Sequence, residues 1–320
     1  MIIELIPYIF IYIIYTILQY MDRSILNSLR ERLLDRGSLR NLPERILMES
    51  IILNTWGTNS IEGNTLTLNE VTSVIETGIT VPNRPVKDLM ETVQLSAALE
   101  EVIRGKLSEV NMASALNLHE TIFRGILPDA GRWRTVNVKI SGSKHSPPRV
   151  EKLLNLLQVW EKQYVEMEMA RRDVFYQASQ MHFGLESIHP FSDGNGRVGR
   201  LLLNIHFLNH NWPLVHILPH DRNVYMDALE SAHTGGVEKL TEFLKTNMAG
   251  SLLFALDLAG SEEDRLLTLN EALGAFHKDY SAKYLALRIK QGELPGIMIN
   301  SRWMTSLAAL RLYGEIKGRV

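Results

Sequence analysis

The chain has 320 residues, of which 45% are hydrophobic and 22% are charged, the composition of a globular protein with one large domain or two smaller ones. Its formal net charge of -2 gives no chain-wide electrostatic reason to bind nucleic acid, and the absence of cysteine excludes disulfides and cysteine-rich metal sites. A reducing compartment is compatible with this composition, so we expect the protein in the cytoplasm.

The N-terminal segment is strongly apolar. Residues 2–21 carry no charge from Leu5 to Tyr20, a span shorter than the roughly 20 apolar residues that cross a bilayer. The segment also lacks the basic start and the small-residue cleavage site of a signal peptide. We predict a helix packed on a soluble body. The alternative is a membrane anchor with the rest of the chain in the cytoplasm, which the basic residues after the segment favour. These are Arg23, Arg30, Arg32 and Arg36.

Most of the chain shows helical periodicity, with apolar residues three and four positions apart. The clearest such segments are 25–35, 43–56, 154–167, 175–188 and 237–259. Strand-like alternation occurs once, in TVNVKIS (135–141), and turn-forming residues follow it in 142–149. The sequence therefore predicts a mainly α fold with one β-hairpin and no larger sheet. The expected divisions are an N-terminal segment (1–42), an N-terminal helical region (43–110), a catalytic core (111–257) and a C-terminal module (265–320).

The segment HPFSDGNGRVGR (189–200) concentrates residues that could bind an anion. Gly194 and Gly196 flank Asn195 where the next helical pattern begins, and a glycine-rich turn that opens a helix directs free N–H groups at one point. Arg197 and Arg200 are three residues apart, so both can lie on one helix face near that point. Two arginines beside a helix N-terminus suit a polyphosphate.

Two further side chains of this segment could act on the bound anion. Asp193 precedes the glycines, and one carboxylate beside phosphates is a usual ligand for Mg²⁺. His189 lies four residues upstream, where a neutral imidazole could take a proton from an attacking hydroxyl. Taken singly, these residues are typical of a turn, a helix cap and a solvated helix face. Their combination within twelve residues favours a phosphoryl or nucleotidyl transfer site.

HPFSDGNGRVGR resembles the signature HPFx(D/E)GNGRxxR of the Fic family, with every defining position filled. The resemblance implies transfer of AMP from ATP to a hydroxyl side chain of a target protein. It implies that His189 deprotonates a Ser, Thr or Tyr hydroxyl and that Asp193 holds Mg²⁺. Gly194, Asn195 and Gly196 would form the anion hole, Arg197 and Arg200 would bind the outer phosphates, and Phe191 would be a packing residue.

Residues 131–154, which contain the predicted hairpin, are similar to the flap of the same family. In that family the flap pairs with the backbone of the target by strand addition. A plain structural hairpin is the alternative. The tip of the flap would consist of Ile140, Ser141, Gly142, Ser143, Lys144 and His145.

TNSIEGN (58–64) resembles the inhibitory motif of the family, with Thr58, Glu62 and Gly63 at its defining positions. A glutamate held against Arg200 would occupy the place of the γ-phosphate. A helix-capping role for Glu62 is the alternative.

The segment 223–233 departs from the family's adenine pocket, because Met226 and His233 stand where a tyrosine and an asparagine are usual. Tyr225 lies one residue earlier, and we take Tyr225 and His233 as the candidates for nucleotide binding.

Residues 280–315 resemble the excisionase-like, MerR-related helix-turn-helix domains that bind DNA. The helical YLALRIKQGELP is followed by an apolar turn, GIMIN, then Arg-Trp and a further helix, so we expect a small winged-helix-like module. Residues 277–320 carry eight Lys or Arg and three Asp or Glu, a local net charge of +5 that suits DNA. An apolar turn in place of a basic one departs from the pattern, and a module for protein contacts is the alternative.

The resemblance leaves three other functions open. The first is removal of AMP from a modified target, with Glu62 aligning a water. The second is phosphate transfer of the Doc type, but Doc proteins carry lysine at the position of Gly196. The third is a DNA-binding regulator whose Fic domain senses nucleotide. The expected partners are ATP with Mg²⁺, a protein target with a hydroxyl side chain, and DNA through residues 265–320; a homodimer and membrane contact through residues 2–21 stay open.

Overall fold

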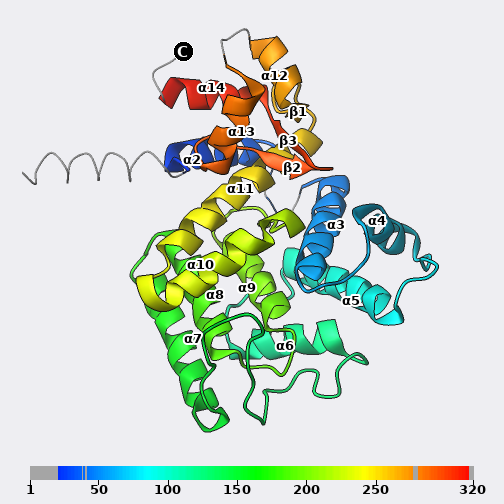
Figure 1. Ribbon diagram of the computed structural model, residues 1–320, viewed down its shortest axis with the longest axis vertical. Coiled ribbons are helices and arrows are strands. Elements are labelled where there is room, and N and C mark those ends of the chain that lie inside the picture. Colours follow the sequence, from blue (N-terminus) through cyan, green and yellow to red (C-terminus); the bar gives the residue numbers. More distant parts are fainter. Residues whose placement is uncertain (1–20, 38, 40–41, 277–279, 317–320) are drawn as a thin grey trace, which may run out of the picture. The chain divides into compact units, whose positions relative to one another are not determined.

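The computed structural model describes residues 21–37, 39, 42–276 and 280–316 (Figure 1). The helix expected over residues 2–21 lies outside this range except for Met21. None of the helices formed by the described residues is long and apolar enough to cross a membrane. These residues are mainly helical, so the predicted fold class is confirmed.

The chain forms two compact units whose bounds differ from the expected divisions. One unit spans residues 38–244 and therefore unites the expected N-terminal helical region with most of the catalytic core. The other combines residues 245–320 with the N-terminal residues up to Gly37. Arg32 of its N-terminal helix α2 (Arg23–Leu34) and Arg36, just after the helix, pair with the fully buried Asp264 and so fasten this segment to the C-terminal module.

The regular secondary structure described within residues 38–244 consists of helices. Three of its helices match the periodicity of the sequence, although α3 extends five residues further than predicted and so reaches the inhibitory motif. Its helices are α3 (Glu44–Ile61), α4 (Leu68–Thr77), α5 (Val86–Ile103), α6 (Met112–Phe123), α7 (Leu153–Met169), α8 (Val174–Ile188), α9 (Asn195–Asn209), α10 (Arg222–Gly235) and the start of α11 (Glu238–Leu258).

Helix α9 is the centre of this unit. It packs against α8, α5, α6 and α3, and nearly every residue from Asn195 to Leu208 is buried. A helix that is covered on all sides needs an apolar surface all round, which LLLNIHFL provides. Its first turn also buries Arg197 and Arg200, and buried guanidinium groups require partners.

Gly57 sets how closely α3 approaches the rest of the unit. A Cβ atom at this position would lie 2.5 Å from the backbone oxygen of Ile217. Only glycine therefore allows α3 to pack against the segment 214–218 at this depth. This close packing fixes where the C-terminal end of α3 presents Glu62.

The hairpin predicted over 135–149 is wrong as a β structure. Residues 131–149 are all described, and they contain no strand. The alternation of TVNVKIS has no partner ladder, because Pro147 and Pro148 opposite it lack N–H groups. Side chains take the backbone groups instead: Asn137 accepts from the Val150 N–H at 3.0 Å. The flap is an extended loop with a turn after Ile140.

The C-terminal module contains a small sheet that the periodicity did not predict. The segment GIMIN was expected to be a turn, which is wrong: most of it forms strand β2 (Ile297–Ile299), which pairs with β3 (Arg302–Thr305). Asn300 and Ser301 connect them with φ angles of 48° and 62°, the left-handed pair of a two-residue hairpin turn.

The complete module runs β1 (Leu267–Thr268), α12 (Leu269–Phe276), α13 (Ala282–Lys290), β2, β3 and α14 (Leu307–Ile316) (Figure 1). The antiparallel sheet has the order β1-β3-β2, with Leu267 opposite Thr305 and Ile297 opposite Met304. Helices α12 and α13 precede the β2–β3 hairpin, and α14 follows it. The core of the module is formed by Leu269, Ala272, Leu285, Ile289, Leu294, Leu310 and Tyr313.

Candidate active site

A cavity of about 530 Å³ opens at the N-terminus of α9. Its walls come from the end of α3, the flap, the end of α8, the loop 189–194, the first turn of α9 and one face of α10. The candidate residues that line it are Glu62, Ile140, Ser141, Gly142, Ser143, His189, Asp193, Gly194, Asn195, Gly196, Arg200, Tyr225, Met226 and His233.

The loop 189–194 is held in an unusual backbone conformation. His189 ends α8 with φ 52° and ψ 63°, a left-handed conformation that a non-glycine residue adopts only when its surroundings impose it. The side chain of Asn195 closes the loop, since its amide accepts from the Phe191 N–H at 2.8 Å and donates to the Phe191 oxygen at 3.0 Å. The fully buried Phe191 stacks on His119 at 3.9 Å, which agrees with the packing role expected for it.

Two buried residues that the sequence analysis missed hold this loop. Arg134 donates to the backbone oxygens of His189, Val136 and Pro148 at 2.6–2.9 Å, so one side chain joins the loop to both arms of the flap. His119 accepts from the Gly131 N–H through Nδ1, which leaves its Nε2–H to donate to the Asp193 oxygen at 3.1 Å. Arg134 lies within the flap segment 131–154 and His119 lies in no motif, but a lone Arg or His carries no signal of such a role.

The environment of His189 favours a neutral imidazole. Burial lowers its pKa below the usual value, the Glu186 carbonyl works against this, and the charge on Arg134 adds to the lowering. Its Nδ1 atom is buried, which leaves Nε2 as the ring nitrogen that can meet a substrate. A neutral imidazole at the wall of a cavity can accept a proton.

The first turn of α9 forms an anion cradle that requires glycine. Gly194 caps the helix with φ 83°, and a Cβ atom there would overlap the ring of Phe123. A Cβ atom on Gly196 would meet the carboxylate of Glu62 and lie 2.9 Å from Nη1 of Arg200. The N–H groups at this helix start therefore lie at the cavity wall, where the Gly194 N–H donates to Oδ1 of Asp193 at 2.6 Å and the Glu62 carboxylate lies beside Gly196.

Glu62 and Arg200 form an ion pair inside the cavity. Nη2 of Arg200 donates to Oε1 of Glu62 at 2.6 Å and to the backbone oxygen of Thr58 at 3.2 Å. Burial opposes the charge on Glu62, but Arg200 outweighs it and holds the pKa of Glu62 below its usual value. Nε and Nη1 of Arg200 are buried and have no hydrogen-bond partner among the described residues, so they are donors available to a ligand.

Arg197 lies apart from the cavity. Its Nη1 atom pairs with the buried Glu91 of α5 at 2.6 Å, and its guanidinium lies 4.4 Å from the centre of the Phe123 ring. Both charged side chains are nearly inaccessible, with exposed fractions of 3% and 6%. Of the two arginines expected to bind outer phosphates, the described structure brings only Arg200 to the cavity wall.

Glu186 and Arg222 also line the cavity, and neither was expected from the sequence. Burial raises the pKa of Glu186 to about 7, although the charge of Arg200 opposes the shift. Arg222 donates to the backbone oxygen of Ile61 at 3.0 Å and so holds the end of α3 beside the cavity. Glu186 lies three residues before His189 in a predicted helix, but nothing in the sequence shows that its carboxylate is buried.

The far end of the cavity is aromatic. His233 stacks on His145 of the flap at 3.9 Å and meets the edge of Phe183 at 4.8 Å. Tyr225 is buried, its hydroxyl bonds to Nε2 of His182 at 2.6 Å, and its ring centre lies 5.9 Å from the guanidinium carbon of Arg200, so it supports Arg200 at the cavity wall. The flat rings of His233, His145 and Phe183 suit a nucleobase.

Glu230 of α10 closes the flap over this end. Its carboxylate accepts from the Ser143 hydroxyl at 2.6 Å and from the Lys144 N–H at 3.1 Å. His145 is held at the same time by the Ser187 backbone oxygen at 3.0 Å. The tip of the flap is thus fastened to both α8 and α10.

Asp193 suits a magnesium ion by its chemistry. Its carboxylate lines the cavity beside the anion cradle and is 51% exposed, which leaves room for water and phosphate oxygens. Mg²⁺ binds through one or two carboxylates and keeps several waters, and it prefers oxygen ligands. The residues present therefore fit the ion.

Comparison with known proteins relates this site to one family. Residues 109–207 match the Fic/DOC family. The protein adenylyltransferase Fic of Nematostella vectensis is 28% identical over 234 residues, which is 70% of this chain and 54% of the relative. The protein of the same name from Culex quinquefasciatus is 30% identical over 206 residues, 63% of this chain and 41% of the relative. The chain spans about half the length of the curated relatives it matches.

Solved structures agree with the sequence match. Fic-1 from Caenorhabditis elegans superposes with a TM-score of 0.62 at 27% identity, covering 73% of this chain and 71% of the other. A Fic domain containing signalling protein from Bacteroides thetaiotaomicron gives a TM-score of 0.66 at 20% identity, covering 73% and 97%, and has the same fold. The chain therefore contains a Fic/DOC domain, and its helical body has the Fic fold.

Proposed function

We propose that the chain is a Mg²⁺-dependent protein adenylyltransferase, which transfers AMP from ATP to a Ser, Thr or Tyr hydroxyl and is held inactive by Glu62. The observation that carries the proposal is the ion pair of Glu62 with Arg200 in the cavity that also holds His189 and the glycine cradle. Relatives named protein adenylyltransferases support the activity.

The transfer follows from the residues around the cavity. The hydroxyl oxygen of the target attacks the α-phosphorus of ATP, the bond from that phosphorus to the bridging oxygen breaks, and pyrophosphate leaves. Nε2 of His189 takes the hydroxyl proton, which the lowered pKa of this imidazole permits at neutral pH. The N–H groups at the start of α9, around Asn195 and Gly196, stabilise the negative charge of the α-phosphate.

Asp193 would hold the magnesium ion, which when bound neutralises charge on the phosphates. Arg200 would bind the γ-phosphate through its guanidinium, including the Nη2 group that Glu62 now holds. The predicted role of Arg197 toward the outer phosphates requires that it leave Glu91, so we propose that Arg197 instead positions the first turn of α9.

Inhibition follows from competition for Arg200. The Glu62 carboxylate occupies the guanidinium that a γ-phosphate needs, and two negative groups cannot share it without repulsion. Thr58 takes part through its backbone oxygen, and Gly63, with φ 92°, ends the turn that presents Glu62. ATP can then bind only in a pose that leaves its γ-phosphate unpaired, which disfavours attack at the α-phosphorus.

We propose that the flap residues 140–145 present their backbone to the target by strand addition. The place of residues 140–143 at the wall of the cavity supports this role, and pairing beyond them would require the Lys144 N–H to leave Glu230. The nucleobase would lie against His233, and Tyr225, whose ring centre is 5.9 Å from the guanidinium carbon of Arg200, would line the cavity beside the phosphate-binding residues.

The test is labelling of cell lysate by the Glu62→Gly variant with ATP labelled either in the α- or in the γ-phosphate. AMP transfer moves only the α-label to protein, whereas phosphate transfer moves only the γ-label. The His189→Ala, Glu62→Gly double variant is the control, and its labelling should fall by about 10²–10⁴. Labelling from γ-labelled ATP alone would refute adenylylation.

Removal of AMP from a modified target is the rival within the same site. Glu62 is 31% exposed, so its carboxylate could also align a water for that reaction. Mass spectrometry of an AMP-modified target distinguishes the two. Loss of AMP in the presence of wild type, abolished in Glu62→Gly, would favour the reverse reaction over autoinhibition.

We also propose that the C-terminal module binds DNA. Its strand and helix order supports this, with α13 as the recognition helix and the β2–β3 hairpin as the wing. Lys283 and Lys290 on α13 and Arg302 at the wing are exposed. The full chain should shift duplex DNA in a mobility assay, and Lys283→Glu with Arg302→Glu should abolish the shift. Lys162→Glu, an exposed change on α7, is the matched control, and an equal effect of both would contradict the proposal.

A further inference from the structure

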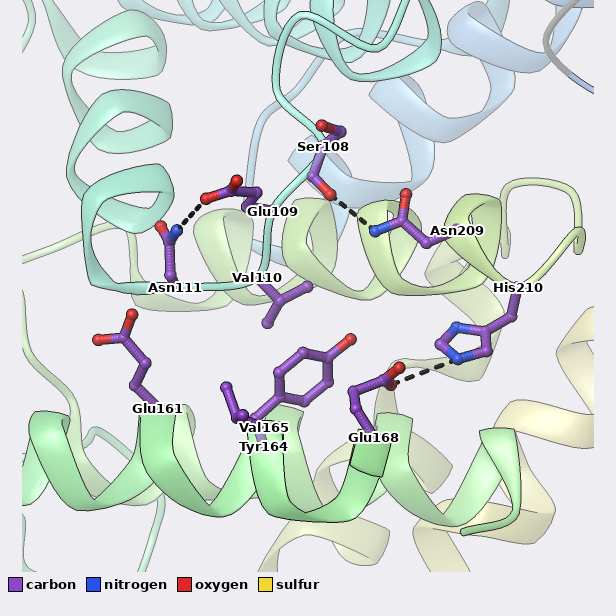
Figure 2. A pocket seen from close by; sticks show the side chains of 10 residues that line it. All are labelled: Ser108, Glu109, Val110, Asn111, Glu161, Tyr164, Val165, Glu168, Asn209 and His210. Carbon is purple, nitrogen blue, oxygen red and sulfur yellow. Dashed lines mark hydrogen bonds and ion pairs between the residues drawn. The ribbon is translucent and has the colours of Figure 1, made fainter. Parts of the chain in front are cut away.

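A second cluster of polar side chains lies where α7 and α9 end, away from the nucleotide cavity. Glu168 comes from the last turn of α7, while His206 and His210 are four residues apart at the end of α9. Oε1 of Glu168 is 3.3 Å from Nε2 of His210 and 3.8 Å from Nδ1 of His206. Figure 2 shows Glu168 and His210 facing each other at the edge of a cavity of about 370 Å³.

Backbone hydrogen bonds fix the tautomers of both histidines. Nε2 of His206 lies 2.8 Å from the Val174 oxygen, and Nδ1 of His210 lies 2.8 Å from the His206 oxygen. A carbonyl oxygen only accepts, so each of these nitrogens carries the proton. The lone pairs of the other two nitrogens, Nδ1 of His206 and Nε2 of His210, therefore point toward Glu168. Metal-binding histidines are oriented in this way, with the second ring nitrogen donating to a carbonyl.

The carboxylate oxygen between them is buried. Oε1 of Glu168 accepts no hydrogen bond from the two imidazoles, and the phenol of Tyr164 is the donor within its reach. Three electron-rich atoms thus converge within 4.8 Å of one another, with only the phenol proton of Tyr164 directed at His206 Nδ1, at 2.9 Å.

Two of the three separations between the ligand atoms fit a tetrahedral ion, and the third is within 4.8 Å. Ligand atoms at about 2.0–2.2 Å from zinc in a tetrahedral site lie about 3.3–3.6 Å from each other, and the two measured separations lie at or just above this range. Two imidazoles and a carboxylate are ligands of Zn²⁺, whereas Mg²⁺ and Ca²⁺ prefer oxygen alone. Glu168 and His210 are 35% and 26% exposed, so an ion can enter from solvent.

We propose that Glu168, His206 and His210 bind a Zn²⁺-class transition metal ion, with its fourth position open to the adjoining cavity. The site is separate from the nucleotide cavity, since the described residues that line that cavity include none of the three. Metal binding requires a change at Tyr164, whose phenol now donates to Nδ1 of His206. When the metal takes that lone pair, the phenol would donate to another acceptor. The ion would tie the end of α7 to the end of α9, the helix whose other end carries the anion cradle.

The test is zinc titration of the purified full chain after treatment with a chelator, read by a competing chromophoric chelator. Wild type should bind one Zn²⁺ per chain, and Co²⁺ in its place should give the visible bands of tetrahedral cobalt. His210→Ala and the isosteric Glu168→Gln should each weaken binding by at least about 100-fold, beyond the effect of losing an outer-shell partner. Glu161→Gln, which changes another carboxylate of α7 on the same cavity, should bind as wild type does (Figure 2).

Tyr164→Phe separates a metal site from a hydrogen-bonded core network. Removing the phenol removes the competitor for His206 Nδ1, so zinc affinity should be unchanged or higher even where the protein is less stable. Absence of stoichiometric zinc from wild type, equal affinity of His210→Ala, or loss of zinc in Tyr164→Phe as large as in His210→Ala would each overturn the assignment. Labelling with ATP is measured in parallel, and it can fail without affecting this outcome.

Discussion

Replacing Glu62 by glycine should both activate and destabilise the protein. In the wild type, Arg200 is 3% exposed and its Nη2 atom has Glu62 at 2.6 Å and the Thr58 oxygen at 3.2 Å. Removing one partner of a buried ion pair costs about 3–5 kcal/mol, and the lower value applies because Glu62 is 31% exposed. We therefore expect a loss of about 3 kcal/mol in the free energy of unfolding without nucleotide.

The same energy sets the gain in activity. A γ-phosphate no longer has to displace Glu62 from Arg200, and about 3 kcal/mol at 1.4 kcal/mol per tenfold change gives a rise of about 100-fold in transfer rate. Because the phosphate replaces the lost partner, ATP should stabilise Glu62→Gly more than it stabilises the wild type. Autolabelling with α-labelled ATP measures the rate, and denaturant unfolding with and without ATP measures the stability.

Glu91→Gln is the matched control for this experiment. It weakens another buried arginine–glutamate pair of the same length, 2.6 Å, but its arginine, Arg197, lies outside the cavity wall. It should lower stability without raising labelling. Equal labelling by wild type and Glu62→Gly, or equal activation by Glu91→Gln, would refute the competition for Arg200, although a Fic-type transfer could still occur.

Three further changes test the remaining chemistry. His189→Ala in the Glu62→Gly variant should reduce labelling by about 10²–10⁴ while circular dichroism stays unchanged. Because burial lowers the pKa of His189, the fall of kcat/KM at acid pH should have its inflection below the usual value of 6.5, and an inflection above that value would contradict this. Asp193→Ala should remove the difference in ATP affinity between Mg²⁺ and chelator that calorimetry detects in wild type. Burial raises the pKa of Glu186 from 4.5 to about 7, so the folded protein keeps this proton at a pH where the unfolded chain has released it. The contribution of Glu186 to the free energy of unfolding is therefore present below pH 4.5 and is lost as the pH rises to about 7. Glu186→Gln should flatten that decline in unfolding free energy, and an unchanged slope would rule out Glu186 as its source.

The helices and the glycine cradle could be predicted because their signals are local. Apolar spacing predicted α7 and α8 to within two residues, and the glycine pattern around Asn195 predicted the start of α9. The flap was mistaken for a hairpin because alternation describes one strand only, and the paired prolines Pro147 and Pro148 remove donors from the other. GIMIN was expected to be a turn, but most of it forms a strand. It does so because a pairing partner, Arg302–Thr305, follows it in the sequence.

What the sequence could not supply was the pairing of distant charges. Arg197 and Arg200 are equivalent by spacing, yet tertiary packing gives one to Glu91 and the other to Glu62. Glu186 is an ordinary helical glutamate in the sequence, and only its burial makes it titrate near neutral pH. These differences depend on which helices surround α9, and no local pattern encodes that.

Arg134 holds the flap through backbone oxygens, and this affects which flap residues can be substituted during evolution. Its guanidinium binds the backbone oxygens of His189, Val136 and Pro148, and every amino acid supplies such an oxygen. Side chains along the flap can therefore be exchanged without loosening its base, provided that Arg134 itself stays. Under the proposed function, selection for a new protein target can act on residues 140–145 while the backbone geometry around His189 is kept.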